Sequence, residues 1–330
     1  MAVVGESGSG KTTLLNTLLR HQPLTAVVMN EFGEVGLDHQ LLEETRGPLA
    51  LLAGGCVCCQ VQGALAPTLK NLWLGRQDGK LPPFERVVIE TTGIADPAPI
   101  LETLLRDRYI AARYRMDGVV TTVDAVLALA QLDDHPEARR QVAVADRLLL
   151  TKTDLATGVD IKRLRARLAA LNPAAGQTEV THGAIDPADI LGLGQFDPAS
   201  RIPDVTRWLA EARYAPTGTP RPGLMRRAVP DTSAHASIRG FVVSFDAPVD
   251  WPGLAAGLEM LLSFRARNLL RLKGIVNARG ETRPLVIHAV QHVFHDPAWL
   301  SQWPDDDRRT RLVFITDGLE TIDATAVGTS

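Results

Sequence analysis

The sequence predicts an α/β protein whose N-terminal part is a doubly wound, mostly parallel sheet and whose C-terminal part is a second, smaller α+β domain. Over residues 1–213, short apolar runs alternate with longer amphipathic segments. Buried strands that alternate with helices are typical of parallel sheets covered on both faces. After residue 236, several apolar runs accompany a single amphipathic segment, which predicts an antiparallel sheet with one helix.

Each expected element follows from its own residue pattern. In the first domain (1–213) we expect a very short strand before residue 5 and further strands at 26–29, 86–89, 118–121 and 147–150. The expected helices are 12–20, 64–74, 97–109 and 161–171. Because so little chain forms the first strand, we expect the natural N-terminus to lie upstream of Met1.

A change of composition separates the two domains. Proline and glycine recur between 216 and 223, which predicts a linker over 214–236. In the second domain (237–319) we expect strands at 238–245, 269–276, 285–293 and 311–315, with a helix at 251–263, and then a tail at 320–330. Arg271 and Lys273 alternate with leucines, so we expect them on a solvated face of this sheet.

Composition excludes several classes of partner. The 330 residues carry a net charge of −3, so nothing favours binding to nucleic acid or to an anionic membrane. No apolar run approaches the roughly 20 residues that span a bilayer, and no secretion signal is evident. The three cysteines are clustered and form no disulfide framework. We therefore expect a soluble, cytoplasmic protein.

The motif Gly5-Glu6-Ser7-Gly8-Ser9-Gly10-Lys11-Thr12 has the context of a P-loop, between a strand and a helix. Its glycines allow backbone N–H groups to surround phosphate oxygens, and the helix dipole adds to the attraction. Lys11 is expected at the β- and γ-phosphates and the Thr12 hydroxyl on Mg²⁺. The predicted nucleotide-binding residues here are Gly5, Gly8, Ser9, Gly10, Lys11, Thr12 and Thr13.

A second motif, Glu90-Thr91-Thr92-Gly93, ends an apolar strand. We expect Glu90 to bind Mg²⁺ through water and the Gly93 N–H to sense the γ-phosphate. No residue is an evident general base, so Lys11, Thr12, Glu90 and Gly93 would act by positioning and electrostatics, with slow intrinsic turnover.

The segment Thr151-Lys152-Thr153-Asp154 follows another apolar strand. Asp154 is expected to accept hydrogen bonds from guanine N1 and the exocyclic amine, which adenine cannot supply. Lys152 is expected to lie over the base or to brace the P-loop. Because Asp154 can pair with guanine, the predicted nucleotide is GTP. Thr151 stands where the usual pattern has asparagine.

All the cysteines lie in Cys56-Val57-Cys58-Cys59, after Gly54 and Gly55. Three thiolates on one loop suit Zn²⁺ or Cu⁺, and a tetrahedral zinc ion would leave one ligand position open. An incomplete shell of protein ligands fits transfer of metal better than permanent structural binding. We expect Zn²⁺ at Cys56, Cys58 and Cys59, with Co²⁺ also compatible.

Together these motifs resemble the CobW-type GTPases, a family that includes zinc metallochaperones. The resemblance rests on the P-loop, on Gly-Gly-Cys-x-Cys-Cys, on Glu-Thr-Thr-Gly-x-Ala-Asp-Pro at 90–97, and on residues 30–38, 270–274 and 290–294. It covers nearly the whole chain. The chain departs from the family pattern at Glu6 and Ser7, which replace an apolar pair, and in its short first strand.

The resemblance implies GTP-dependent transfer of Zn²⁺ from the cysteines to a client metalloprotein, by a GTPase of the SIMIBI class that forms nucleotide-dependent homodimers. The GTP state would rearrange the loops around Cys58, with Glu31 and Glu34 in the switch region. Three other functions remain open: a metal-sensing G-protein switch without delivery, a P-loop kinase for a small molecule, and metal insertion for cobalamin or nitrile hydratase. We interpret His288, His292 and His295 as ordinary surface histidines.

Overall fold

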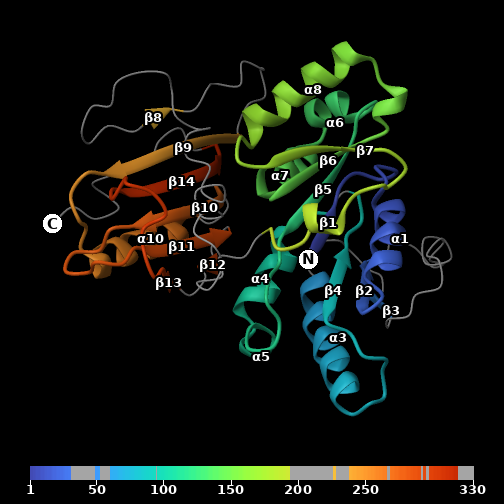
Figure 1. The fold of residues 1–330 in the computed structure, drawn as a ribbon, viewed down its shortest axis with the longest axis horizontal. Helices are drawn as coiled ribbons and strands as arrows, with labels where there is room; N and C mark the ends of the chain where they lie inside the picture. The colour runs from blue at the N-terminus through green and yellow to red at the C-terminus, as the bar shows by residue number, and fades with distance from the viewer. Residues whose placement is uncertain are drawn as a thin grey trace. The chain divides into compact units, whose positions relative to one another are not determined.

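The computed structural model describes residues 1–30, 49–52, 60–93, 95–193, 226–227, 238–265, 268–290, 293–294 and 297–318. The chain divides into two compact units, 1–165 with 175–195 and 166–174 with 196–330 (Figure 1). Among the described residues, each unit contains one sheet.

The first sheet is seven-stranded and parallel, in the order β3-β2-β4-β1-β5-β6-β7. Its strands are β1 (Ala2–Val4), β2 (Thr25–Asn30), β3 (Leu49–Leu52), β4 (Arg86–Glu90), β5 (Val119–Asp124), β6 (Arg147–Thr151) and β7 (Gly176–Val180). The short strand β1 lies at the centre, paired with β4 on one side and β5 on the other. The expected doubly wound sheet is confirmed.

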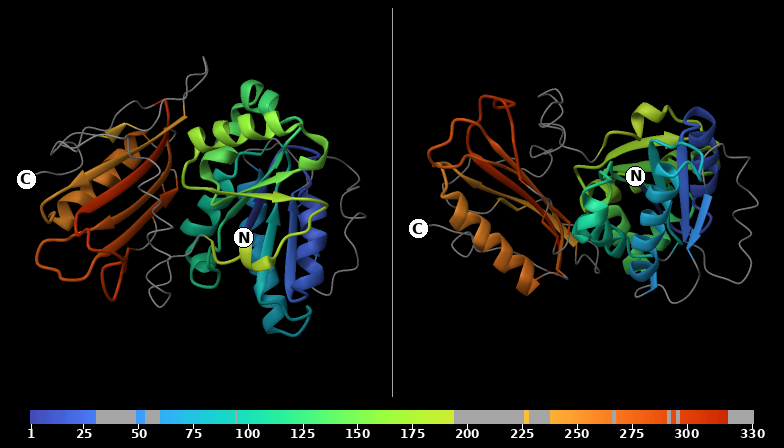
Figure 2. Two further views of the ribbon diagram at one scale, coloured as in Figure 1. Left: turned by 45° about the horizontal axis from the view of Figure 1, so that its top comes forward. Right: turned by 90° about the horizontal axis from the view of Figure 1, so that it is seen from below.

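Helices cover both faces of this sheet, as Figure 2 shows. They are α1 (Lys11–His21), α3 (Gln60–Gln77), α4 (Ala98–Arg106), α5 (Arg108–Ala111), α6 (Ala128–Asp134), α7 (Pro136–Val144) and α8 (Gly158–Leu171), with 3₁₀ turns η1 (Thr153–Leu155) and η2 (Pro187–Asp189). Side chains on a strand alternate between the two faces. In β2, Val27 and Met29 pack in the core under α1, whereas Ala26 and Val28 pack in the core under α3 and α4. Both faces are therefore buried.

The single helix expected at 97–109 is two helices. The chain turns at Asp107, whose backbone is extended (φ −72°, ψ 111°). Its carboxylate accepts hydrogen bonds from the backbone N–H groups of Tyr109 (2.8 Å) and Ile110 (3.1 Å), which caps α5. The capping carboxylate stabilises a new helix start where apolar periodicity alone predicts continuation.

The second unit holds an antiparallel sheet in the order β12-β11-β10-β14-β9-β8, with β13 paired to β11. Its elements are β8 (Arg226–Arg227), β9 (Ile238–Phe245), α10 (Trp251–Arg265), β10 (Leu269–Val276), β11 (Leu285–Val290), β12 (Val293–Phe294), β13 (Ala298–Trp299) and β14 (Thr310–Asp317). The expected α+β domain is confirmed. The strand expected at 285–293 is two strands, because β12 pairs back onto β11. Part of the expected linker forms β8.

One face of α10 packs on this sheet. Leu254, Leu258 and Leu262 recur at helical spacing and are buried with Phe241 and Phe314, whose rings stack with centroids 5.4 Å apart. This core has its own set of residues and shares none with the cores of the first unit.

The expectation that Arg271 and Lys273 lie on a solvated face is wrong. Their exposed fractions are 4% and 7%. Strand β10 is central, and Lys273 lies opposite His288 on β11 and Val313 on β14. Alternation along a strand indicates which residues share a face, but it does not show whether that face is covered.

We predict that Leu258→Ala lowers the free energy of unfolding by about 2–5 kcal/mol, because it opens a cavity in the core beneath α10. Urea denaturation followed by the intrinsic tryptophan fluorescence, to which Trp251 at the start of the same helix contributes, measures the change. Met260→Ala is the matched control, since Met260 lies on α10 with 59% exposed. Equal destabilisation by both substitutions would contradict this assignment of the core.

Candidate nucleotide-binding site

The loop between β1 and α1 has the backbone of a phosphate-binding loop. Gly5, Gly8 and Gly10 all have positive φ, at 142°, 73° and 95°, a conformation that L side chains rarely adopt. A Cβ on Gly5 would collide with Thr122 on β5, whereas a Cβ on Gly8 would meet no atom within 4 Å. The loop is therefore packed against the sheet at Gly5 and open at Gly8.

Lys11 is buried at the start of α1 and reaches back over the loop. Its Nζ donates hydrogen bonds to the carbonyl oxygens of Gly5 (2.9 Å) and Glu6 (3.0 Å). These bonds hold the ammonium group against the loop. The phosphate-binding role expected for Lys11 stays a prediction.

Hydroxyl groups from β5 and β6 support the loop from below. The hydroxyls of Ser9 and Thr122 are 2.6 Å apart, and Thr122 Oγ1 also donates to the Val4 carbonyl at 3.2 Å. Thr151 Oγ1 donates to the Ser9 carbonyl at 2.8 Å. Thr151 thus braces the P-loop from the position where the usual pattern has asparagine. Sequence reasoning missed Thr122, for which the available signal was a hydroxyl within a buried apolar strand.

The two residues expected to hold Mg²⁺ lie together. Thr12 Oγ1 donates a hydrogen bond to Glu90 Oε1 at 3.4 Å, and Glu90 is buried at the end of β4. The hydroxyl oxygens of Thr91 and Thr92 are also buried there and have no hydrogen-bond partner within the described parts of the chain. Hydroxyl and carboxylate oxygens are the ligands that Mg²⁺ prefers, so these residues fit that ion.

Gly93 lies directly against the P-loop. A Cβ at this position would collide with the backbone nitrogen and the side-chain oxygen of Ser7. Its carbonyl oxygen accepts a hydrogen bond from Gln141 Nε2 on α7 at 2.8 Å. Only glycine fits this close approach of two backbone segments.

The segment expected to bind the base follows β6. Lys152 has a left-handed backbone (φ 57°), which is uncommon for a residue other than glycine. Its Nζ lies 2.6 Å from Asp124 Oδ2, a carboxylate that also accepts from the backbone nitrogens of Val126 and Leu127. Asp154 lies exposed on η1, and no hydrogen bond joins its carboxylate to another described residue. Its carboxylate is open to a ligand.

Several predicted residues lie outside the described residues: Cys56, Cys58, Cys59, Glu31, Glu34, His292 and His295. Among the residues that the structure does describe, no group of three His, Cys, Asp or Glu side chains could hold a metal ion. The described chain leaves β3 at Leu52 and enters α3 at Gln60. The predicted zinc site therefore stays a prediction, as does the role of Thr13, whose side chain is exposed on α1.

Comparison with known proteins matches both units to family models. The CobW/HypB/UreG nucleotide-binding domain matches residues 1–179, and the cobalamin synthesis protein cobW C-terminal domain matches residues 238–326. The chain belongs to the CobW family of P-loop GTPases. Its GTPase activity agrees with the P-loop, the Thr12–Glu90 pair and the placement of Gly93.

Two bacterial relatives match this GTPase over most of their length. The zinc chaperone YjiA of Escherichia coli is 36% identical, over 95% of this chain and 92% of that protein. The zinc chaperone CobW of Pseudomonas aeruginosa is 30% identical, over 96% and 87%. The crystal structure of Zn(II)-bound YjiA GTPase from E. coli matches with a TM-score of 0.68 at 31% identity, over 96% and 93%. In the described part of this chain, no helix is long and apolar enough to cross a membrane.

We predict that Thr151→Val weakens the binding of GDP and of a GTP analogue alike, by about threefold to tenfold. The substitution removes the hydrogen bond that holds the Ser9 carbonyl, and one such bond contributes about 0.5–1.5 kcal/mol. Calorimetric titration measures both affinities. Thr103→Val is the matched control, because its hydroxyl bonds the Pro99 carbonyl within α4. Unchanged affinities in Thr151→Val would show that this brace is dispensable.

Proposed function

We propose that this GTPase is a zinc chaperone that binds Zn²⁺ through Cys56, Cys58 and Cys59 and passes it to a client metalloprotein under control of GTP. The observation that supports the proposal is the P-loop with Lys11 folded onto it and Thr12 beside Glu90, in a chain with relatives that are named zinc chaperones. The cysteine cluster is the part of the sequence suited to the metal.

In this proposal each residue of the site has one task in hydrolysis. Backbone N–H groups of the P-loop and the Lys11 ammonium bind the phosphates and stabilise the charge that develops during transfer. Mg²⁺, held by Thr12 and through water by Glu90, would polarise the terminal phosphates when bound. The Gly93 N–H donates to a γ-phosphate oxygen. Since no general base is assigned, orientation and electrostatics supply the catalysis.

Recognition of guanine would depend on Asp154. The left-handed Lys152 and its ion pair with Asp124 fix the chain where it turns into η1, and Asp154 follows on that turn. A carboxylate there can accept from both guanine N1–H and the exocyclic amine. Loss of either hydrogen bond leaves a polar group without its partner, which discriminates strongly between bases.

Hydrolysis of GTP to GDP would change the affinity of the cysteines for Zn²⁺. Loss of the γ-phosphate removes the partner of the Gly93 N–H, and segments that contact a γ-phosphate commonly rearrange when it leaves. Thiolates bind Zn²⁺ only when deprotonated, so a change of nearby charge alters their affinity. The proposal also includes a nucleotide-dependent homodimer, which the family resemblance implies.

We predict that the wild type prefers GTP to ITP by about tenfold or more, because inosine lacks the exocyclic amine, and that Asp154→Ala removes this preference. Competition binding of the two nucleotides measures the ratio. Asp160→Ala is a suitable control, as Asp160 is an exposed carboxylate nearby on α8 that bonds only Thr157 among the described side chains. A ratio that is the same in the wild type and in Asp154→Ala would exclude Asp154 from base recognition.

We predict one tight Zn²⁺ site whose affinity differs between the GDP complex and the complex with a non-hydrolysable GTP analogue. Competitive titration of reduced protein with a chromophoric chelator measures it in each state. Cys58→Ala should weaken the site by at least about tenfold, since a thiolate ligand is lost. Equal Zn²⁺ affinities in both nucleotide states would sink the GTP-gated mechanism, and an unchanged site in Cys58→Ala would place the metal elsewhere.

A further inference from the structure

Gln141 on α7 is a buried polar residue that holds the backbone beyond β4. Its Nε2 donates to the carbonyl oxygens of Gly93 (2.8 Å) and Ala95 (2.9 Å). Its own backbone carbonyl accepts from Thr121 Oγ1 on β5 at 3.0 Å. Both hydrogens of the amide are therefore used on the segment that carries Gly93, while the backbone of Gln141 is fixed to the sheet.

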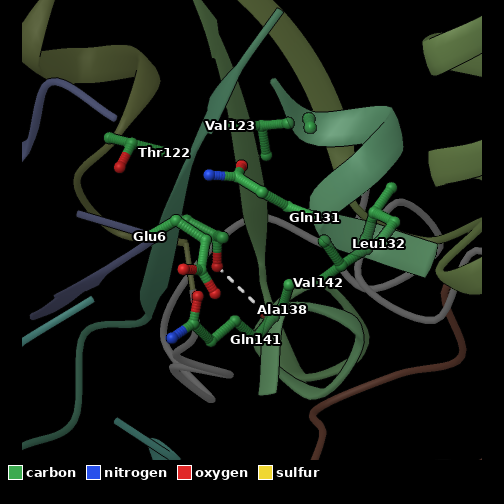
Figure 3. A pocket seen from close by; sticks show the side chains of 10 residues that line it. Glu6, Thr122, Val123, Gln131, Leu132, Ala138, Gln141 and Val142 are labelled. Carbon is green, nitrogen blue, oxygen red and sulfur yellow. Dashed lines mark hydrogen bonds between the residues drawn. The ribbon is translucent and has the colours of Figure 1, made fainter. Parts of the chain in front are cut away.

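Glu6 of the P-loop faces Gln141 from the other side. Glu6 is only 9% exposed, and its Oε1 has no hydrogen-bond partner among the described residues. It lines a cavity of about 20 Å³, enough for one water molecule, together with Gln131 and Gln141. Figure 3 shows the carboxyl group of Glu6 and the amide oxygen of Gln141 pointing toward one another.

Two acceptor oxygens that face one another need a hydrogen between them, from a protonated carboxyl group or from a water molecule in the cavity. The Gln141 amide cannot supply it, because its Nε2 bonds Gly93 and Ala95. Burial raises the pKa of the Glu6 carboxyl, an effect that His135 and Lys11 oppose and Glu137 reinforces. The acid form of Glu6 can therefore donate to the oxygen of Gln141.

We propose that Glu6 and Gln141 form a pair that couples the P-loop to the backbone at Gly93, with Gln141 as a positioning residue for GTP hydrolysis. Glu6 and Gln141 line the same cavity. The loop meets Gly93 directly through Ser7, and it meets the carbonyl side of Gly93 through Glu6 and Gln141. The backbone of Gly93 is thereby held at its Cα by the close approach of Ser7 and at its carbonyl by Gln141, which limits the orientations that its N–H can take.

This inference rests on the proposed γ-phosphate role of Gly93. It also gives a reason for the chain's departure from the family pattern at Glu6, where an apolar residue would leave the Gln141 oxygen without a donor from the P-loop. The cost of such an orphaned buried acceptor favours a donor at this position.

The test is the ratio of affinities for a non-hydrolysable GTP analogue and GDP, measured with kcat and KM for GTP. In Gln141→Leu we expect the ratio to fall about tenfold and kcat to fall with it, because Gly93 loses its anchor. Gln131→Leu is the matched control, as Gln131 lines the same cavity but makes no hydrogen bond to Gly93 or Ala95. We expect its ratio to stay within about twofold of the wild type.

Glu6 variants test the same pair through its other member. They keep the pair testable if Gln141→Leu does not fold. Glu6→Gln keeps a donor at every pH and should keep the ratio, whereas Glu6→Ala should lower it. In the wild type the ratio should fall as pH rises through the raised pKa of Glu6, since the carboxylate has no proton to donate. Comparison with Glu6→Gln at each pH removes the contribution of every group other than Glu6.

Two results would overturn the pair. One is an unchanged ratio in a folded Gln141→Leu, and the other is an equal loss of both affinities, which indicates a merely structural role. The wild-type ratio separates this failure from failure of the proposed function. If the wild type binds the GTP analogue more tightly than GDP and a folded Gln141→Leu keeps that ratio, the pair is wrong and γ-phosphate sensing stands. If the wild type itself binds both nucleotides equally, the γ-phosphate is not sensed.

Discussion

The close approach of Gly93 to Ser7 is the constraint on which the rest of the site depends. It follows from the parallel pairing of β1 and β4, which places Ala2 beside Ile89 and Val3 beside Glu90. The segments that follow these two strands therefore leave the sheet at the same edge and side by side. Thr12 and Glu90 meet for the same reason, at 3.4 Å. The phosphate loop and the predicted Mg²⁺ ligands are thus placed by strand register, and a side chain at position 93 would collide with the loop at Ser7.

The neighbouring strands β5 and β6 support the loop with small hydroxyl side chains. Threonine suits these two strand positions for two reasons. Its branched Cβ favours a strand, and its hydroxyl reaches a loop carbonyl. Thr151 reaches Ser9 from β6, and the next residue, Lys152, accepts a left-handed backbone while its ammonium pairs with Asp124. A strained backbone of this kind persists only where surrounding contacts hold it. Here the left-handed Lys152 lies between Thr151, which braces the loop, and Asp154, whose carboxylate is open to a ligand.

The sequence predicted the parts of the site that local motifs specify, and it missed the parts that distant residues complete. The placement of Lys11, Thr12, Glu90 and Gly93 follows from two motifs at the ends of adjacent strands. Thr122 and Gln141 belong to no motif, and their roles depend on partners 113 and 48 residues away. The break at Asp107 depends on a side-chain cap within an apolar pattern. The burial of Arg271 and Lys273 depends on β10 being central, which alternation does not indicate.

Strand order also limits how nucleotide state can reach a metal held by the cysteines. Cys56 follows β3 by four residues, and β3 is separated from β4 by β2 alone. Neighbouring strands lie about 4.8 Å apart, so the ends of β3 and β4 are about 10 Å apart. Two unit charges at that separation interact by about 1.7 kcal/mol at an effective dielectric constant of about 20, which is roughly fifteenfold in affinity. In the proposed zinc chaperone a charge effect of this size would give modest gating, and a larger change in Zn²⁺ affinity requires that the loops themselves rearrange. The backbone at Gly93, held between Ser7 and Gln141, is where that rearrangement would begin.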